Sequence, residues 1–155
     1  KIIIMWQSSI TAYLHYLGFM LSFAALTVEV FNLKTEMTLN ETKKVIFADL
    51  TYGLAAIAIL VTGILRVLYF GKGTDYYLYN PFFHAKMGVF ILLSLLSLYP
   101  TYTFLTWIKD FRNGKPPTLE VAKINRLSWL IKGELVAFIL LPLLAAIMAR
   151  MNSWS

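Results

Sequence analysis

The sequence predicts an all-α integral membrane protein, a bundle of four transmembrane helices joined by short loops. Of its 155 residues, 59% are hydrophobic and only 14% are charged. A soluble domain of this size has too much surface for its volume to enclose so many apolar side chains in a core. The excess apolar surface therefore has to face the lipid bilayer, and the length of the chain indicates a single membrane domain.

Four apolar stretches are long enough to cross the hydrocarbon layer, which is about 30 Å thick and requires about 20 helical residues. The first stretch carries no charge from Ile2 to Val28, and the third contains Pro100, which is expected to kink its helix or to end the regular part. The predicted spans are residues 8–31, 45–68, 82–108 and 127–149.

Basic residues are concentrated in two of the three loops. The first and third loops contain Lys34, Lys43, Lys44, Lys109, Arg112, Lys115, Lys123 and Arg126, whereas the second loop contains Lys72. The positive-inside rule then predicts that both basic loops are cytoplasmic and that both termini lie outside. The net charge of +6 is therefore interpreted as a topology signal of a bacterial cytoplasmic membrane protein, and no nucleic-acid partner is expected.

Ionisable side chains at membrane depth are costly, so each one is a functional hypothesis. The two histidines, His15 and His84, are expected in the outer half of the first and third spans, close to Arg66 and Lys86. Two imidazoles from different helices can ligate a haem iron, and nearby cations suit the haem propionates. The alternative is that each histidine forms a hydrogen bond with a neighbouring helix. A bis-histidine haem also requires matched depths, and His15 is expected to lie deeper than His84.

Three carboxylates, Glu29, Asp49 and Glu134, are expected together near the inner face. They could bind a divalent cation or pass protons. The alternative is that they form interhelical ion pairs, with Lys44 and Lys132 nearby, or that Asp49 and Glu134 lie near helix N-termini, where the helix dipole favours negative charge. Glu29 is expected near a helix C-terminus and therefore needs a specific partner.

Regular spacing predicts which faces point into the bundle. His15, Ser22 and Glu29 are seven residues apart and share one stripe of the first span. Asp49, Tyr52, Ala56, Gly63 and Arg66 form the corresponding stripe of the second span. Small residues allow close approach of membrane helices, and they are expected to do so at Gly53, Ala56, Gly63 and Gly88.

Several motifs resemble a family of small four-helix bacterial membrane proteins that is catalogued as a domain of unknown function. They comprise Glu29, Ala48-Asp49-Leu50-Thr51-Tyr52-Gly53-Leu54-Ala55-Ala56, Gly63-Ile64-Leu65-Arg66, Tyr76-Tyr77-Leu78-Tyr79-Asn80-Pro81-Phe82-Phe83-His84-Ala85-Lys86-Met87, Ser97-Leu98-Tyr99-Pro100-Thr101 and Met148-Ala149-Arg150. The resemblance covers nearly the whole chain and implies a fold but no activity.

Leu14-His15 and Phe83-His84-Ala85-Lys86-Met87 are also similar, more distantly, to motifs of the HemJ-type protoporphyrinogen oxidases and CopD-like proteins. This resemblance implies that His15 ligates haem b and that His84 and Lys86 line the site. The chain departs from the pattern where Glu29-Val30-Phe31 replaces the Leu-Pro-Arg that ends the first HemJ helix. The resemblance therefore implies a porphyrin or quinone site more than the oxidase activity.

Three functions remain open at the level of sequence. The first is a membrane protein that binds haem b or a related redox cofactor near its outer face. The second is a non-enzymatic accessory subunit of a larger membrane complex, such as a respiratory complex, or a homo-oligomer. The third is proton or cation transport. Thiolate chemistry is excluded because the chain has no cysteine, and the motifs of soluble hydrolases and nucleotide-binding proteins are absent from the sequence.

Overall fold

The computed structural model describes residues 2–151 and confirms the all-α fold, since this part of the chain contains helices and no strand. Its four long helices are α1 (Ile2–Asn32), α2 (Leu39–Leu65), α4 (Pro81–Arg112) and α5 (Val121–Met151). A π-helical turn, η1 (Arg66–Phe70), extends α2, and the short α3 (Thr74–Leu78) leads into α4. All four long helices are long and apolar enough to cross a membrane.

The long helices extend beyond the predicted spans. Helix α2 begins at Leu39 and α5 begins at Val121, several residues before the predicted starts at 45 and 127. Thr38 explains the early start of α2, because its hydroxyl accepts a hydrogen bond from the Glu41 backbone N–H while the Glu41 carboxylate accepts one from the Thr38 N–H. Pro100 does not end α4, which continues through it to Arg112.

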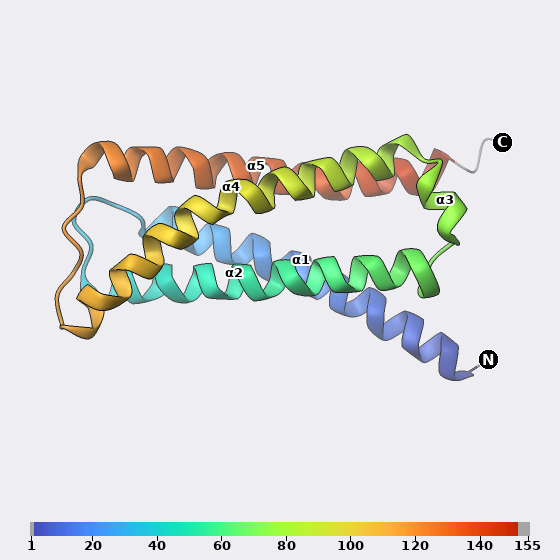
Figure 1. Cartoon of the computed structure of the whole chain (residues 1–155), viewed down its shortest axis with the longest axis horizontal. Helices are drawn as coiled ribbons and strands as arrows, with labels where there is room; N and C mark the ends of the chain where they lie inside the picture. Colours follow the sequence, from blue (N-terminus) through green and yellow to red (C-terminus); the bar gives the residue numbers. More distant parts are fainter. Residues whose placement is uncertain (1, 152–155) are drawn as a thin grey trace.

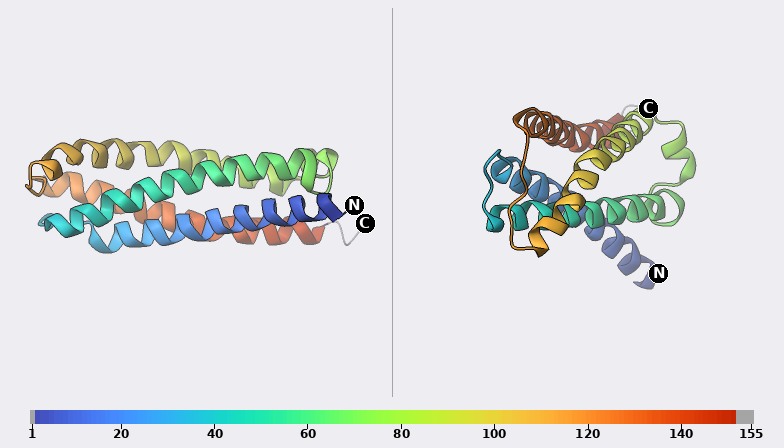
Figure 2. Two further views of the ribbon diagram at one scale, coloured as in Figure 1. Left: turned by 90° about the horizontal axis from the view of Figure 1, so that it is seen from below. Right: turned by 60° about the vertical axis from the view of Figure 1, so that its left-hand side comes forward.

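Both basic loops lie at one end of the elongated bundle, while α3, the start of α1 and the end of α5 lie at the other (Figure 1). The second view in Figure 2 shows the same separation of the two ends. The relative placement of the loops therefore agrees with the topology predicted from sequence. We call the end that holds α3 the outer end and the opposite end the inner end, in accordance with that topology.

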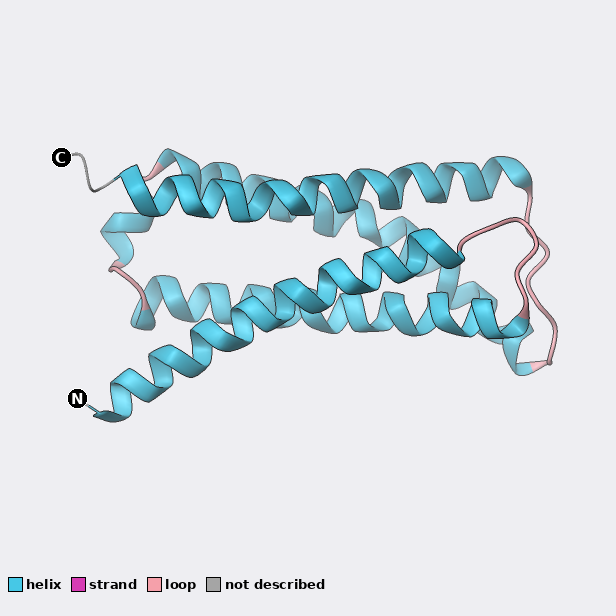
Figure 3. Cartoon of the chain, turned by 180° about the vertical axis from the view of Figure 1, so that it is seen from behind, coloured by secondary structure: helices cyan, strands magenta, loops and turns pink. Residues whose placement is uncertain are grey.

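The long helices follow the order α1–α2–α4–α5 around the bundle. Helix α1 packs against α2 and α5, and α4 packs against α5 and α2. Within residues 2–151, the backbones of α1 and α4 do not approach each other closely, so the two helices lie on a diagonal. Figure 3 shows α1 crossing α2, with its outer part leaning away from α4 and α5.

A glycine permits close contact between α1 and α2. A Cβ atom at Gly18 would lie 3.0 Å from Ile59 Cγ1 and 3.2 Å from the Ala55 carbonyl oxygen. Close packing of small residues is a main source of attraction between helices in lipid. The sequence-based prediction for Gly53 and Gly88 is wrong, because a Cβ atom at either position would meet no described atom within 4 Å.

Three aromatic rings fill the bundle between α1, α2 and α5. The Phe138 ring stacks on Phe19 at a centroid distance of 5.3 Å and meets the Tyr52 ring edge-on at 6.0 Å. Phe138 is only 1% exposed. We call these three side chains the aromatic layer, and we expect it to contribute strongly to stability because buried rings make many dispersion contacts.

The substitution Phe138→Ala tests this packing. We expect it to lower the free energy of unfolding by about 3–5 kcal/mol, since it leaves a cavity opposite Phe19 and Tyr52. Leu98→Ala is the control, because Leu98 is 62% exposed and faces away from the core; its cost should stay below about 1 kcal/mol. Reversible unfolding in mixed detergent micelles measures both, and equal losses for the two variants would contradict the packing.

Candidate functional site

Three carboxylates from three helices are buried together in the inner half of the bundle. Glu29 of α1 and Glu134 of α5 are each 1% exposed, and Asp49 of α2 is 4% exposed. The Glu29 carboxylate interacts electrostatically with those of Asp49 and Glu134, so the three groups occupy one region as the sequence predicts. We call them the acid layer.

The acid layer has few partners. The Thr101 hydroxyl donates a hydrogen bond of 2.8 Å to Asp49 Oδ1, which links α2 to α4. Glu29 Oε1 and Glu134 Oε1 are buried without any hydrogen-bond partner among residues 2–151. A buried polar atom that lacks a partner costs free energy, so each such atom calls for an explanation, such as a bound water, an ion or a catalytic role.

The predicted ion pairs of the acid layer do not form within the described chain. Lys44 and Lys132 are exposed, and Lys34 Nζ forms an ion pair with Glu41 Oε1, 2.7 Å apart, beside the first loop and away from the acid layer. Lipid-embedded carboxylates usually pair with a cation or line a pathway. The acid layer therefore contains buried carboxyl groups that no described basic side chain pairs with.

The helix-dipole alternative is also wrong. Since α2 begins at Leu39 and α5 at Val121, Asp49 and Glu134 lie well inside their helices. The dipole effect fades within the first turn of a helix, so it cannot stabilise these carboxylates. The prediction failed because the helices begin before the apolar stretches from which their starts were predicted.

Three hydroxyl groups complete the polar interior around the acid layer. The Tyr52 hydroxyl interacts electrostatically with all three carboxylates, and Ser97 of α4 lies beside it. Ser22 is fully buried on the same stripe of α1 as Glu29, and its Oγ has no hydrogen-bond partner in the part of the chain that is described. Across residues 2–151, no group of three His, Cys, Asp or Glu side chains could hold a metal ion.

The outer half contains a second polar group, centred on His15. Its Nδ1 lies 3.0 Å from Thr62 Oγ1 of α2, and the Thr62 hydroxyl donates its proton to the Ala58 carbonyl at 2.5 Å. Because Thr62 donates its hydroxyl proton to Ala58, its oxygen can only accept from His15. The Nδ1 atom of His15 therefore carries the proton, and the lone pair of the neutral imidazole lies on Nε2. The histidine therefore forms the interhelical hydrogen bond that was the alternative to haem ligation.

Two cations accompany His15, but the second histidine has a different partner. The charges of Lys86 and Arg66 both act on the His15 imidazole, so these three predicted residues do share a region. Arg66 also lies 5.4 Å from the centre of the Tyr16 ring. His84 is exposed, and its Nε2 donates a 2.7 Å hydrogen bond to the Leu78 carbonyl of α3.

Two hydrogen-bonding residues of the polar groups were not identified from the sequence. Thr62 and Thr101 form hydrogen bonds with His15 and Asp49 of other helices, but a threonine in an apolar helix usually bonds only to its own helix, as Thr51 does to Phe47. No pattern in one sequence separates the two behaviours. Ser22 and Tyr52 were placed on the inward stripes, and the structure confirms that both side chains are buried.

Comparison with known proteins assigns a family. The model of the family described as "Predicted membrane protein (DUF2214)" matches residues 7–151, nearly the whole chain. No curated protein and no solved structure matches the chain. The family and the four spanning helices support a membrane protein, and activity has to be argued from the side chains themselves.

Proposed function

We propose that this chain, which belongs to the predicted-membrane-protein family whose model it matches, transfers protons within the bacterial cytoplasmic membrane through its acid layer. The observation that carries the proposal is the pair of buried carboxylate oxygens, Glu29 Oε1 and Glu134 Oε1, which lack hydrogen-bond partners among the described residues. Carboxylates that face a bundle interior are the usual carriers of protons in membrane proteins.

The chemistry of the acid layer suits a proton better than a metal ion. A calcium or magnesium ion needs six or more oxygen ligands, and the three carboxylates do not converge closely enough to form a metal site within residues 2–151. A proton needs only one oxygen and a route. Because the three carboxylates and the Tyr52 hydroxyl interact with one another, a proton that binds one of them changes the affinity of the others.

A route toward the outer end follows the inward stripe of α1. Ser22 lies seven residues from Glu29 and seven from His15, which corresponds to about 10 Å along the helix in each direction. These gaps exceed a hydrogen bond, so water has to enter for a proton to cross them. The aromatic layer lies along this route and would act as the barrier, since Phe138 is one turn from Glu134 toward the outer end.

The substitution Glu29→Gln tests the proposal, because it keeps the shape of the side chain and removes its ability to carry a proton. We expect proton flux into proteoliposomes, measured with an enclosed pH-sensitive dye under an imposed potential, to fall by about tenfold or more. The control is Glu36→Gln, an exposed glutamate of the first loop, which should leave the flux unchanged. Wild-type flux no greater than that of empty vesicles would refute proton transfer.

A haem group bound by the outer polar group is the second candidate. The specific observation in its favour is the hydrogen bond from His15 Nδ1 to Thr62, because it orients the ring and leaves the Nε2 lone pair for a ligand bond. Arg66 and Lys86 would then suit the propionates. His84 fits a second ligand less well, since its Nε2 is bonded to the Leu78 carbonyl.

A visible spectrum tests the haem candidate. If haem binds as proposed, the protein reconstituted with haem shows a Soret band that His15→Ala removes, whereas Lys72→Ala, at an exposed loop cation, retains it. Absence of the band from wild type after reconstitution would eliminate the candidate. The accessory-subunit and homo-oligomer alternatives stay predictions.

A further inference from the structure

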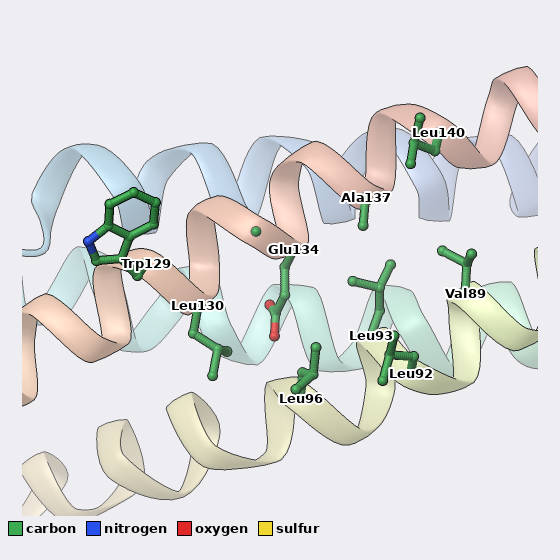
Figure 4. A pocket seen from close by; sticks show the side chains of 10 residues that line it. Val89, Leu92, Leu93, Leu96, Trp129, Leu130, Glu134, Ala137 and Leu140 are labelled. Carbon is green, nitrogen blue, oxygen red and sulfur yellow. The ribbon is translucent and has the colours of Figure 1, made fainter.

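A cleft between α4 and α5 opens on the lipid-facing side of the bundle. It has a volume of about 350 Å³, within the range of small-molecule sites, and its walls are almost entirely apolar. Leu92, Leu96 and Leu140 line it and are each at least 40% exposed, so molecules dissolved in the bilayer can reach it from the side. Figure 4 shows the cleft between the two helices.

One carboxyl group is directed into this apolar cleft. Glu134 lines it, and its carboxylate points from α5 toward α4, close to Leu96 and Leu130 (Figure 4). The side chain is 1% exposed, and its Oε1 has no hydrogen-bond partner in the part of the chain that the structure describes. A buried carboxylate oxygen directed into an open apolar cleft is a polar anchor for a ligand that is otherwise apolar.

The charge around the cleft favours a cation over a neutral or anionic ligand. Asp49 is a second carboxyl group that acts on Glu134, and Glu29 is a third in the same layer, so a bound cation would be attracted by whichever of them ionises. Lys132, the nearest basic residue along α5, is exposed and does not pair with Glu134. Trp129 lines the inner end of the cleft, and an indole face attracts organic cations.

We propose that the cleft between α4 and α5 binds a lipophilic organic cation from the bilayer, with its charge beside Glu134 and its apolar groups against the leucine walls. The carboxylate would neutralise the charge, and the leucines would replace the lipid around the rest of the molecule. The inference concerns equilibrium binding and does not depend on proton transfer, so either proposal can fail while the other stands.

Tetraphenylphosphonium is a suitable probe, because its charge is permanent and its surface is apolar. Binding is measured by equilibrium dialysis against the purified chain in a nonionic detergent, with triphenylphosphine oxide as a neutral probe of similar shape. We expect saturable binding of the cation, at least about tenfold tighter than that of the neutral probe, and a loss of about tenfold or more with Glu134→Gln. Glu36→Gln should leave the affinity unchanged.

A second pair of variants separates the cleft from the carboxylate. Ala137→Phe fills the cleft without altering Glu134, whereas Val136→Phe adds the same ring at the neighbouring position, which is 61% exposed and does not line the cleft. We expect only Ala137→Phe to abolish binding, and size-exclusion profiles show whether each variant is folded. Equal affinity for the two probes, absence of saturable binding, or unchanged binding by folded Ala137→Phe would overturn the proposal.

Discussion

Lipid as the solvent of four helices is the constraint on which the rest of this structure depends. With apolar solvent around the bundle, the hydrophobic effect cannot drive the helices together, and close packing takes over that role. Gly18 against Ile59 and the stacked rings of Phe19 and Phe138 provide such packing. The same constraint makes every polar side chain in the interior costly, so the few that occur there carry most of the information about function.

The polar interior is divided into two parts with different character. At the outer end, His15 is paired with Thr62 and accompanied by two cations. At the inner end, three carboxylates have one hydrogen bond between them that the structure records, from Thr101. The aromatic layer lies between the two parts. This arrangement leaves two buried carboxyl oxygens without a described partner where a proton or a lipophilic cation could bind, and both proposals follow from that observation.

The sequence predicted the fold and the membership of the acid layer because both depend on composition and periodicity. The length of the apolar stretches predicted the four spans, and the seven-residue spacing of Ser22 and Glu29 predicted that both lie on the buried face of the first span. Partners could not be predicted in the same way. Whether Asp49 meets a lysine or Thr101 depends on how α2 and α4 are rotated, and whether Gly53 or Gly18 permits close approach depends on the crossing point of two helices.

The central claim is that the three carboxyl groups of the acid layer interact, so that protonation of one changes the proton affinity of the others. The titration of Glu29 tests this claim most directly. Carboxyl-¹³C NMR of glutamate-labelled protein, with the Glu29 signal assigned through Glu29→Gln, follows that titration in detergent. The account predicts that Asp49→Asn shifts the midpoint, while Asp75→Asn, at an exposed acid of α3, leaves it in place. Identical Glu29 curves in wild type and both variants would contradict a shared acid layer.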